Sequence, residues 1–148
     1  MHLILTHEQV DFDALGALVA ARLLISSSLA VLPHKLNQNV RKFVNLYQSE
    51  LGLIDQGDIP MDPIQSVTLV DTQSLVTIKN LRKDAEIFII DHHKQKADLP
   101  ENWKCTFENL GATTTILVQL LKAQSIAITP LHATLILLAI HEDPGSLT

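Results

Sequence analysis

Aspartate and histidine side chains that could hold divalent metal ions occur in four short stretches of the chain. Each stretch lies at the end of an apolar run. The residues are His7, Asp11 and Asp13 in the first stretch, Asp71 in the second, Asp91, His92 and His93 in the third, and Asp143 in the fourth. Carboxylate oxygens and imidazole nitrogens suit Mn²⁺, Mg²⁺ or Fe²⁺. Two such ions about 3.5–4 Å apart can activate water and stabilise an in-line displacement at phosphorus, so the stretches predict a two-metal hydrolytic site.

Each of these residues also has an ordinary structural interpretation. Asp13 could cap a helix by accepting hydrogen bonds from backbone N–H groups, and Asp71 could be a turn residue. A single Asp-His-His triplet occurs by chance in many proteins, and Asp143 is followed by proline and glycine, as in a plain turn. The presence of all four stretches, each at the predicted end of a strand or helix, favours one shared site.

The apolar segments that must position these residues alternate between two patterns. Strand-like runs occupy residues 1–5, 29–32, 67–70, 86–90 and 105–107, and helical patterns occupy residues 13–25, 39–51, 114–123 and 131–140. Short apolar strands that alternate with helices indicate a parallel sheet with both faces covered. We therefore expect an α/β fold with a parallel sheet of about five strands and helices on both faces. Ligands bind outside the carboxyl ends of the strands in such sheets, which is where the four stretches fall.

The composition is typical of one globular domain. The chain has 148 residues, 47% of them hydrophobic, and a net charge of −5, so we expect a single domain over residues 1–148. The negative charge argues against broad adhesion to nucleic acid, although a local basic strip could still guide a phosphate. Four basic side chains close to the predicted site are interpreted as solvated surface residues: Lys35, Arg41, Lys42 and Lys94.

The sequence also predicts a cytoplasmic protein with no membrane partner. No run reaches the roughly 18 uninterrupted apolar residues that a membrane-spanning helix requires. No basic region precedes the first apolar run, as it would in a secretory signal. Cys105 is the only cysteine, which excludes an internal disulfide framework and fits a reducing compartment.

With these residues identified, the chain resembles the DHH phosphoesterase superfamily, which is named after the triplet found here as Asp91-His92-His93. Four segments resemble the motifs of that superfamily, in order: THEQVDFDALGA, LVDT, IDHHK and AIHEDPGSLT. A narrower resemblance is to the N-terminal DHH domain of large bacterial proteins that continue with CBS domains and a poly(A) polymerase or tRNA nucleotidyltransferase head. Four segments carry this second resemblance: THEQVDFDAL, LVDTQSLVT, IDHHK and GATTTILVQLL.

The resemblance implies a role for each candidate residue. His7, Asp11 and Asp71 would hold one metal ion, and a second ion would be held by Asp13, Asp71, His92 and Asp143, so that Asp71 bridges the two. Asp91 would orient an imidazole by hydrogen bonding. His93 would face the substrate phosphate as an electrophilic contact or proton donor. Pro144 departs from the fourth motif, because the family usually has threonine after this aspartate.

The resemblance further implies a function and partners. We expect a phosphoesterase domain with two divalent ions, Mn²⁺ first and Mg²⁺ as the alternative, that hydrolyses a phosphodiester or phosphoanhydride of a nucleotide or short oligonucleotide. Its partner would be a phosphate-containing small molecule or a short single-stranded nucleic acid. The family normally continues into a second, substrate-binding domain, so the chain is expected to be a fragment.

Two other functions remain open on the sequence. The same pocket could bind a nucleotide or RNA without turnover, as a regulatory module of a multidomain nucleotidyltransferase or poly(A) polymerase-like protein. A purely structural α/β domain is disfavoured, because clustered carboxylates without metal would repel one another. The sequence leaves the substrate open among pyrophosphate, a short oligonucleotide, single-stranded nucleic acid and a cyclic dinucleotide.

Overall fold

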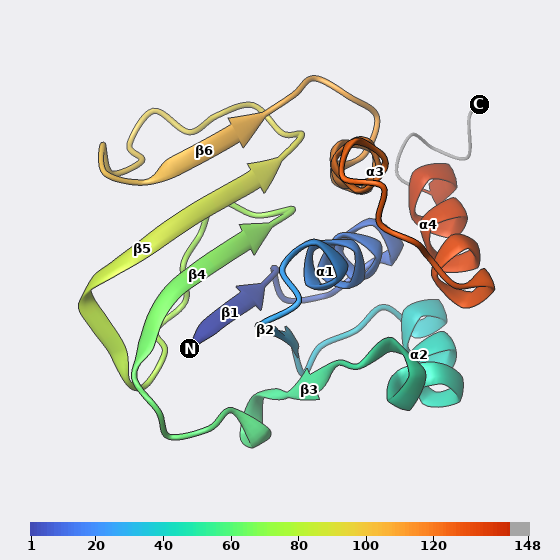
Figure 1. Cartoon of the computed structure of the whole chain (residues 1–148), viewed down its shortest axis with the longest axis horizontal. Helices are drawn as coiled ribbons and strands as arrows, with labels where there is room; N and C mark the ends of the chain where they lie inside the picture. The colour runs from blue at the N-terminus through green and yellow to red at the C-terminus, as the bar shows by residue number, and fades with distance from the viewer. Residues whose placement is uncertain (143–148) are drawn as a thin grey trace.

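Six parallel strands form one sheet in the computed structural model, which describes residues 1–142 (Figure 1). The strands are β1 (His2–Leu5), β2 (Ser28–Leu32), β3 (Ile54–Asp55), β4 (Ile64–Val70), β5 (Leu81–Asp91) and β6 (Lys104–Phe107). They lie in the order β3-β2-β1-β4-β5-β6, and each neighbouring pair is parallel. The chain order reverses between β1 and β4, and such switch points are where open α/β sheets bind ligands.

Four α-helices and one short 3₁₀-helix connect these strands or follow them within residues 1–142. They are α1 (Phe12–Leu24), α2 (Gln38–Leu51), η1 (Gln56–Asp58), α3 (Thr113–Ala123) and α4 (Pro130–Glu142). Helix α1 is apolar almost all round, and its first ten residues are buried, as expected of a helix enclosed on several sides. It packs against the sheet and against both α3 and α4. No helix in residues 1–142 is long and apolar enough to cross a membrane.

The two faces of the sheet are covered by different kinds of structure. On one face, Ile4, Ala30 and Val70 pack into a core with residues of all four α-helices. On the other face, strand residues such as Leu5 and Leu69 pack against apolar side chains from the connecting segments. This alternation follows from the strand period of two, which directs successive side chains to opposite faces.

The predicted α/β fold with a parallel sheet is confirmed, and two details differ. The sheet has six strands instead of about five, because residues 54 and 55, in a stretch with strong loop signals, pair with Val31 and Leu32. The second face is covered within residues 1–142 by the segments 71–80 and 92–103, together with Ile59, and not by α-helices. The first of these segments is rich in β-branched residues, which are weak helix formers. The second is largely polar and contains Pro100, which disfavours a helix.

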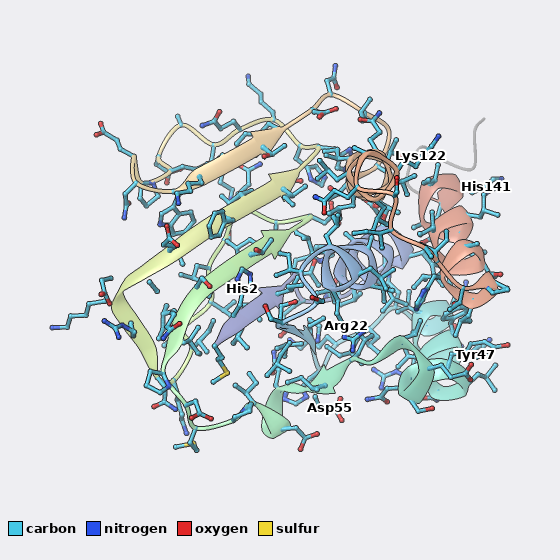
Figure 2. All side chains as sticks on the ribbon, in the orientation of Figure 1. His2, Arg22, Tyr47, Asp55, Lys122 and His141 are labelled. Atoms are coloured by element: carbon cyan, nitrogen blue, oxygen red, sulfur yellow. The ribbon has the colours of Figure 1, made fainter. Side chains whose placement is uncertain are left out.

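His2, at the start of β1, links this strand to β4 through two side-chain hydrogen bonds; Figure 2 labels its position on the sheet. Its Nδ1 hydrogen-bonds to Ser66 Oγ and its Nε2 to Thr68 Oγ1, each at 2.8 Å. Its ring stacks on Phe88 with a centroid separation of 6.2 Å. Burial, and then the charge of the N-terminal ammonium group, lowers the pKa of His2. The contact matters for the site because β1 and β4 lead directly to His7 and Asp71.

We expect the contribution of His2 to stability to fall in acid. The folded pKa lies below the unfolded value of 6.5, so the unfolded chain binds a proton more readily and the contribution is lost as pH falls through that value. The His2→Gln variant cannot show this loss. The difference in free energy of unfolding between wild type and variant should therefore shrink between about pH 7.5 and about pH 5.5 in urea titrations. A difference that stays constant or grows would contradict the account.

Gly16 lies where α1 meets both α3 and α4. A Cβ atom at this position would lie 2.7 Å from Cβ of Ala139 in α4 and 2.7 Å from Oγ1 of Thr114 in α3. Both atoms belong to buried residues, so a methyl group would force two packed helices apart. Thr114 Oγ1 also donates to the carbonyl oxygen of Asp13 at 3.0 Å. The close approach at Gly16 therefore holds the start of α3 against the start of α1.

We predict that Gly16→Ala lowers the free energy of unfolding by up to about 2 kcal/mol, because overpacking usually costs about 1–3 kcal/mol and alanine regains roughly 1 kcal/mol over glycine inside a helix. Gly57→Ala is the matched control, since an added Cβ there meets nothing within 4 Å. Urea unfolding followed by circular dichroism measures both variants. Equal stability of Gly16→Ala and wild type would show that the helices do not pack this closely.

Candidate metal centre

The carboxyl ends of β1, β4 and β5 bring the predicted site residues to one edge of the sheet. Leu5 of β1 is level with Leu69 of β4, and Val70 of β4 is level with Ile90 of β5. His7 follows β1 by two residues, Asp71 directly follows β4, and Asp91 ends β5. Parallel pairing therefore places residues from three distant parts of the chain at the same height.

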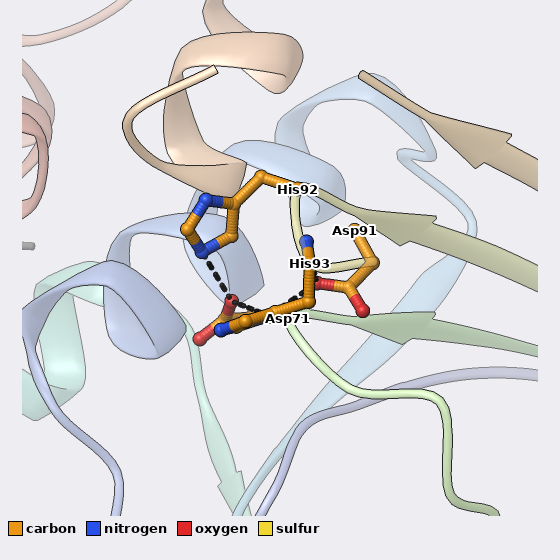
Figure 3. A group of neighbouring side chains, drawn as sticks. All are labelled: Asp71, Asp91, His92 and His93. Atoms are coloured by element: carbon orange, nitrogen blue, oxygen red, sulfur yellow. Dashed lines mark hydrogen bonds and ion pairs between the residues drawn. The ribbon is translucent and has the colours of Figure 1, made fainter. Parts of the chain in front are cut away.

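Two groups of potential ligands meet at Asp71. In the first group, ligand atoms of His7, Asp11 and Asp71 all lie within 4.8 Å of one another. In the second group, the same holds for Asp71, Asp91, His92 and His93 (Figure 3). His7 Nε2 lies 3.2 Å from Asp71 Oδ2, and His92 Nε2 lies 3.7 Å from Asp71 Oδ1. One carboxylate is thus shared, with one oxygen facing each group.

The backbone holds the Asp71 carboxylate in place. Asp71 has a left-handed conformation with φ of 55°, which is uncommon for residues other than glycine and is often found at functional sites. Its N–H donates to the carbonyl oxygen of Ile90 at 3.1 Å. The hydroxyl of Thr113, the first residue of α3, donates to Asp71 Oδ1 at 2.9 Å. Strands β4 and β5 and helix α3 together fix this buried side chain.

The imidazoles of His7 and His92 are oriented by backbone carbonyls. His7 Nδ1 lies 2.6 Å from the carbonyl oxygen of Glu8, and His92 Nδ1 lies 3.0 Å from that of Leu110. A carbonyl only accepts hydrogen bonds, so each Nδ1 carries the proton and each Nε2 is directed at the shared carboxylate. The hydrogen bond to Asp71 raises the pKa of His7 to about 9. A metal ion at His7 Nε2 would take the place of the proton on Nε2, because a histidine ligand must be neutral.

Asp13 and Asp11 both act as helix caps, but for different helices. Asp11 caps its own helix, α1, by accepting the N–H of Ala14 at 2.9 Å. Asp13 is buried and accepts the N–H groups of Thr113 and Thr114, each at 2.8 Å, at the start of α3. Its Oδ2 also lies 4.0 Å from His92 Nε2. Burial, followed by the charge of Asp71, raises the pKa of Asp13 to about 6, so Asp13 sits beside the second group at an electrostatic cost.

Asp91 orients His93 and is itself held by a residue that the sequence did not single out. Asp91 Oδ1 accepts from His93 Nδ1 at 2.8 Å and from the His93 backbone N–H at 3.2 Å. Asp91 Oδ2 accepts from Gln73 Nε2 at 2.6 Å. Gln73 is buried, and it also donates to the carbonyl oxygen of Lys94 and accepts the N–H of Lys96. Gln73 therefore ties the loop after β4 to the loop after β5.

The remaining predicted residues are placed as follows. Asp143 lies outside the described residues. The residue before it, Glu142, accepts the N–H of Phe12 through Oε2 at 3.0 Å, so the end of α4 meets the start of α1. The side chains of the four candidate basic residues are exposed, as expected of solvated positions: Lys35, Arg41, Lys42 and Lys94.

Gln73 and Thr113 are the functional residues that sequence reasoning missed. Their only signal was position, since Gln73 stands two residues after Asp71 and Thr113 opens the helical run after Gly111. Neither residue type is a usual metal ligand. Their importance comes from hydrogen bonds to ligand candidates far away in the chain, which only the folded structure reveals.

Comparison with known proteins shows the family of this chain. Residues 2–140 match the model of the DHH family, N-terminal domain, and the chain belongs to that family. It is 33% identical over 154 residues to an A-adding tRNA nucleotidyltransferase of Geobacter sulfurreducens, covering all of this chain and 18% of that protein. It is 30% identical over 145 residues to the A-adding tRNA nucleotidyltransferase of Aquifex aeolicus, covering 98% of this chain and 17% of that protein. The chain thus spans less than a fifth of these relatives.

Solved structures share the fold at lower sequence identity. A protein from Methanococcus jannaschii described as a family II inorganic pyrophosphatase superposes with a TM-score of 0.69 at 21% identity, over 99% of this chain and 50% of that one. An exopolyphosphatase-related protein from Bacteroides fragilis superposes with a TM-score of 0.71 at 16% identity, over 99% of this chain and 47% of that one. The family match and the two curated relatives confirm the resemblance to the DHH superfamily and to its nucleotidyltransferase-associated branch, and the solved structures confirm the fold.

We predict that Gln73→Met loosens the loop that carries His92 and His93. The substitution keeps the size of the side chain but leaves the buried Asp91 carboxylate without one donor, which costs about 1–3 kcal/mol. Amide hydrogen exchange of residues 92–96 should accelerate, and the free energy of unfolding should fall. Gln119→Met, at an exposed position of α3, is the control and should change neither quantity. Unchanged exchange in Gln73→Met would mean that Gln73 does not anchor this loop.

Proposed function

We propose that this domain holds two divalent metal ions, Mn²⁺ or Mg²⁺, on the two sides of Asp71 and hydrolyses a phosphodiester or phosphoanhydride. The single observation that carries the proposal is the shared carboxylate, whose oxygens face two separate ligand groups. Membership of the DHH family and fold likeness to proteins described as a pyrophosphatase and an exopolyphosphatase-related protein support a phosphoesterase.

The residues present fit such ions. The first ion would take His7, Asp11 and Asp71, and the second would take Asp71 and His92 with Asp13 and Asp143. The donors are oxygens and imidazole nitrogens, which suit Mn²⁺ and Mg²⁺. Asp13 and Asp71 are both buried close to His92, and two neighbouring buried carboxylates both stay ionised only where positive charge compensates them. When bound, the ions would activate water and offset charge on the phosphoryl oxygens.

His93 would serve the substrate directly. Its Nδ1 is bound to Asp91, so its Nε2 is directed away from that carboxylate, and its side chain is 58% exposed. In the hydrolysis, the water oxygen bonds to phosphorus and gives up one proton to solvent, and the bond from phosphorus to the leaving oxygen breaks. The leaving oxygen takes up a proton from His93, which regains one from solvent after the reaction. Asp91 keeps the ring in position and stabilises its charged form.

A second function is supported by the curated relatives. Both are named A-adding tRNA nucleotidyltransferases, and the chain spans less than a fifth of each. The domain could therefore act within a larger cytoplasmic protein, together with a second domain that completes the site, and bind a nucleotide or RNA phosphate without turnover. The two functions share the metal pocket and differ in whether a phosphoester is cleaved.

We predict that Asp71→Asn strongly weakens metal binding and abolishes hydrolysis. Asparagine tolerates the left-handed backbone at this position, so the variant should fold while losing the bridging charge. Calorimetry should show two Mn²⁺ ions per wild-type chain and at least about 100-fold weaker binding in the variant, since changes outside the ligand shell already cost up to that factor. Hydrolysis of bis-p-nitrophenyl phosphate should fall to the uncatalysed rate. Asp58→Asn, at an exposed position, is the control.

The possible outcomes separate the two functions. Two ions with turnover in the wild type support the phosphoesterase. Two ions without turnover support the binding module. Two ions and turnover in Asp71→Asn would contradict the shared-carboxylate assignment itself.

A further inference from the structure

A cavity of about 370 Å³ opens beside the second ligand group. Its wall consists of residues 92–95 after β5 on one side and residues 107–109 at the end of β6 on the other. His92 and His93 belong both to this wall and to the second group. The cavity is therefore continuous with the candidate metal centre at these two side chains.

The register of the sheet places this cavity beside the second ligand group, at the carboxyl ends of β5 and β6. Asp91 of β5 is level with Phe107 of β6, so both walls leave the sheet at the same height. The first ligand group lies over β1 and β4, the second over β4 and β5, and the cavity over β5 and β6. A substrate whose phosphate lies at Asp71 and His93 can extend over β5 into the cavity, on the side of the sheet where ligands are expected.

Both walls are tied to the centre by hydrogen bonds. Gln73 Nε2 donates to the carbonyl oxygen of Lys94 at 3.1 Å on one side. His92 Nδ1 donates to the carbonyl oxygen of Leu110 at 3.0 Å on the other, and the N–H of Leu110 donates to the carbonyl oxygen of Glu108 at 2.9 Å. The cavity is thus held in shape before a ligand arrives, which lowers the entropic cost of binding.

We propose that this cavity binds the base of a nucleotide whose phosphate lies at His93. The inference rests on the proposed function for the phosphate position and adds the class of group that neighbours it. The volume lies in the range of small-molecule sites, about 300–1,000 Å³, and exceeds what a phosphate needs. The side-chain amides of Gln95 and Asn109 offer donors and acceptors for the edge of a base, and Phe107 offers an aromatic surface.

The charges of the cavity favour a neutral group over a second phosphate. Lys94 contributes one positive charge and Glu108 one negative charge to the lining. The Glu108 carboxylate in the cavity wall would repel a second phosphate. It can instead accept a hydrogen bond from an exocyclic amino group of adenine, guanine or cytosine. The substrate class is therefore a nucleotide or short oligonucleotide with an amino-bearing base, in preference to pyrophosphate.

The test compares AMP with ribose 5-phosphate, which lacks only the base. The full 148-residue chain is titrated with each in the presence of Mg²⁺, and side-chain amide signals of Gln95 and Asn109 are followed by NMR. We expect AMP to bind about tenfold more tightly, as expected for one or two good polar contacts, and to shift both amide signals. Asn109→Leu and Gln95→Leu should each reduce this preference, while Asn39→Leu, on the exposed side of α2, should retain it.

Equal affinities for the two ligands, or shifts that are the same with both, would overturn the base site. This result is independent of turnover, because neither ligand needs to be hydrolysed. Failure of the wild-type chain to cleave bis-p-nitrophenyl phosphate would contradict the phosphoesterase and leave a measured AMP preference standing. Cleavage without an AMP preference would support the phosphoesterase and remove the base site.

Discussion

The carboxylate of Asp71 lies at the centre of the site, and residues from the β1, β5 and α3 sides approach it. His7 approaches one oxygen from the β1 side, and His92 and Thr113 approach the other from the β5 and α3 sides. The residue is buried and lies next to Asp13, so its charge cannot be screened by water. Such a group is costly unless positive charge compensates it. The surrounding imidazoles, each fixed through Nδ1, are placed to share that compensation with the proposed cations.

The architecture explains how a short chain can assemble such a site. Three parallel strands end at the same height, and each needs only one or two further residues to reach a candidate ligand: His7, Asp71 or His92. Helix α3 contributes through its N-terminus, where Asp13 accepts two backbone N–H groups and Thr113 donates to Asp71. Gly16 allows α1 to approach α3 and α4 closely enough for these contacts. Packing in the helical layer and geometry in the site are therefore coupled.

Much of this arrangement could be predicted from local sequence. The parallel α/β fold followed from short apolar runs that alternate with helical patterns. The candidate residues stood out because Asp71 and Asp91 come at the ends of buried strands, where an uncompensated carboxylate would be destabilising. Their grouping at one edge then followed from the parallel direction of the strands. The roles of individual ligands stay predictions.

Other features depend on contacts that a local pattern does not encode. The cap that Asp13 forms on α3 joins residues 100 and 101 positions apart, whereas the sequence suggested a cap on the adjacent helix. Gln73 has no periodic or motif signal, because its role arises from the distance between two loops. The two-residue strand β3 is too short for any alternation to show, and its pairing with β2 comes only from the packing of the chain.

The central claim, that Asp71 bridges two metal ions, is tested most directly by anomalous diffraction at the manganese edge on crystals of the chain grown with Mn²⁺. The account predicts two peaks about 3.5–4 Å apart, with one Asp71 oxygen at each, His7 at the first ion and His92 at the second. A single peak, or two peaks of which only one contacts Asp71, would contradict it.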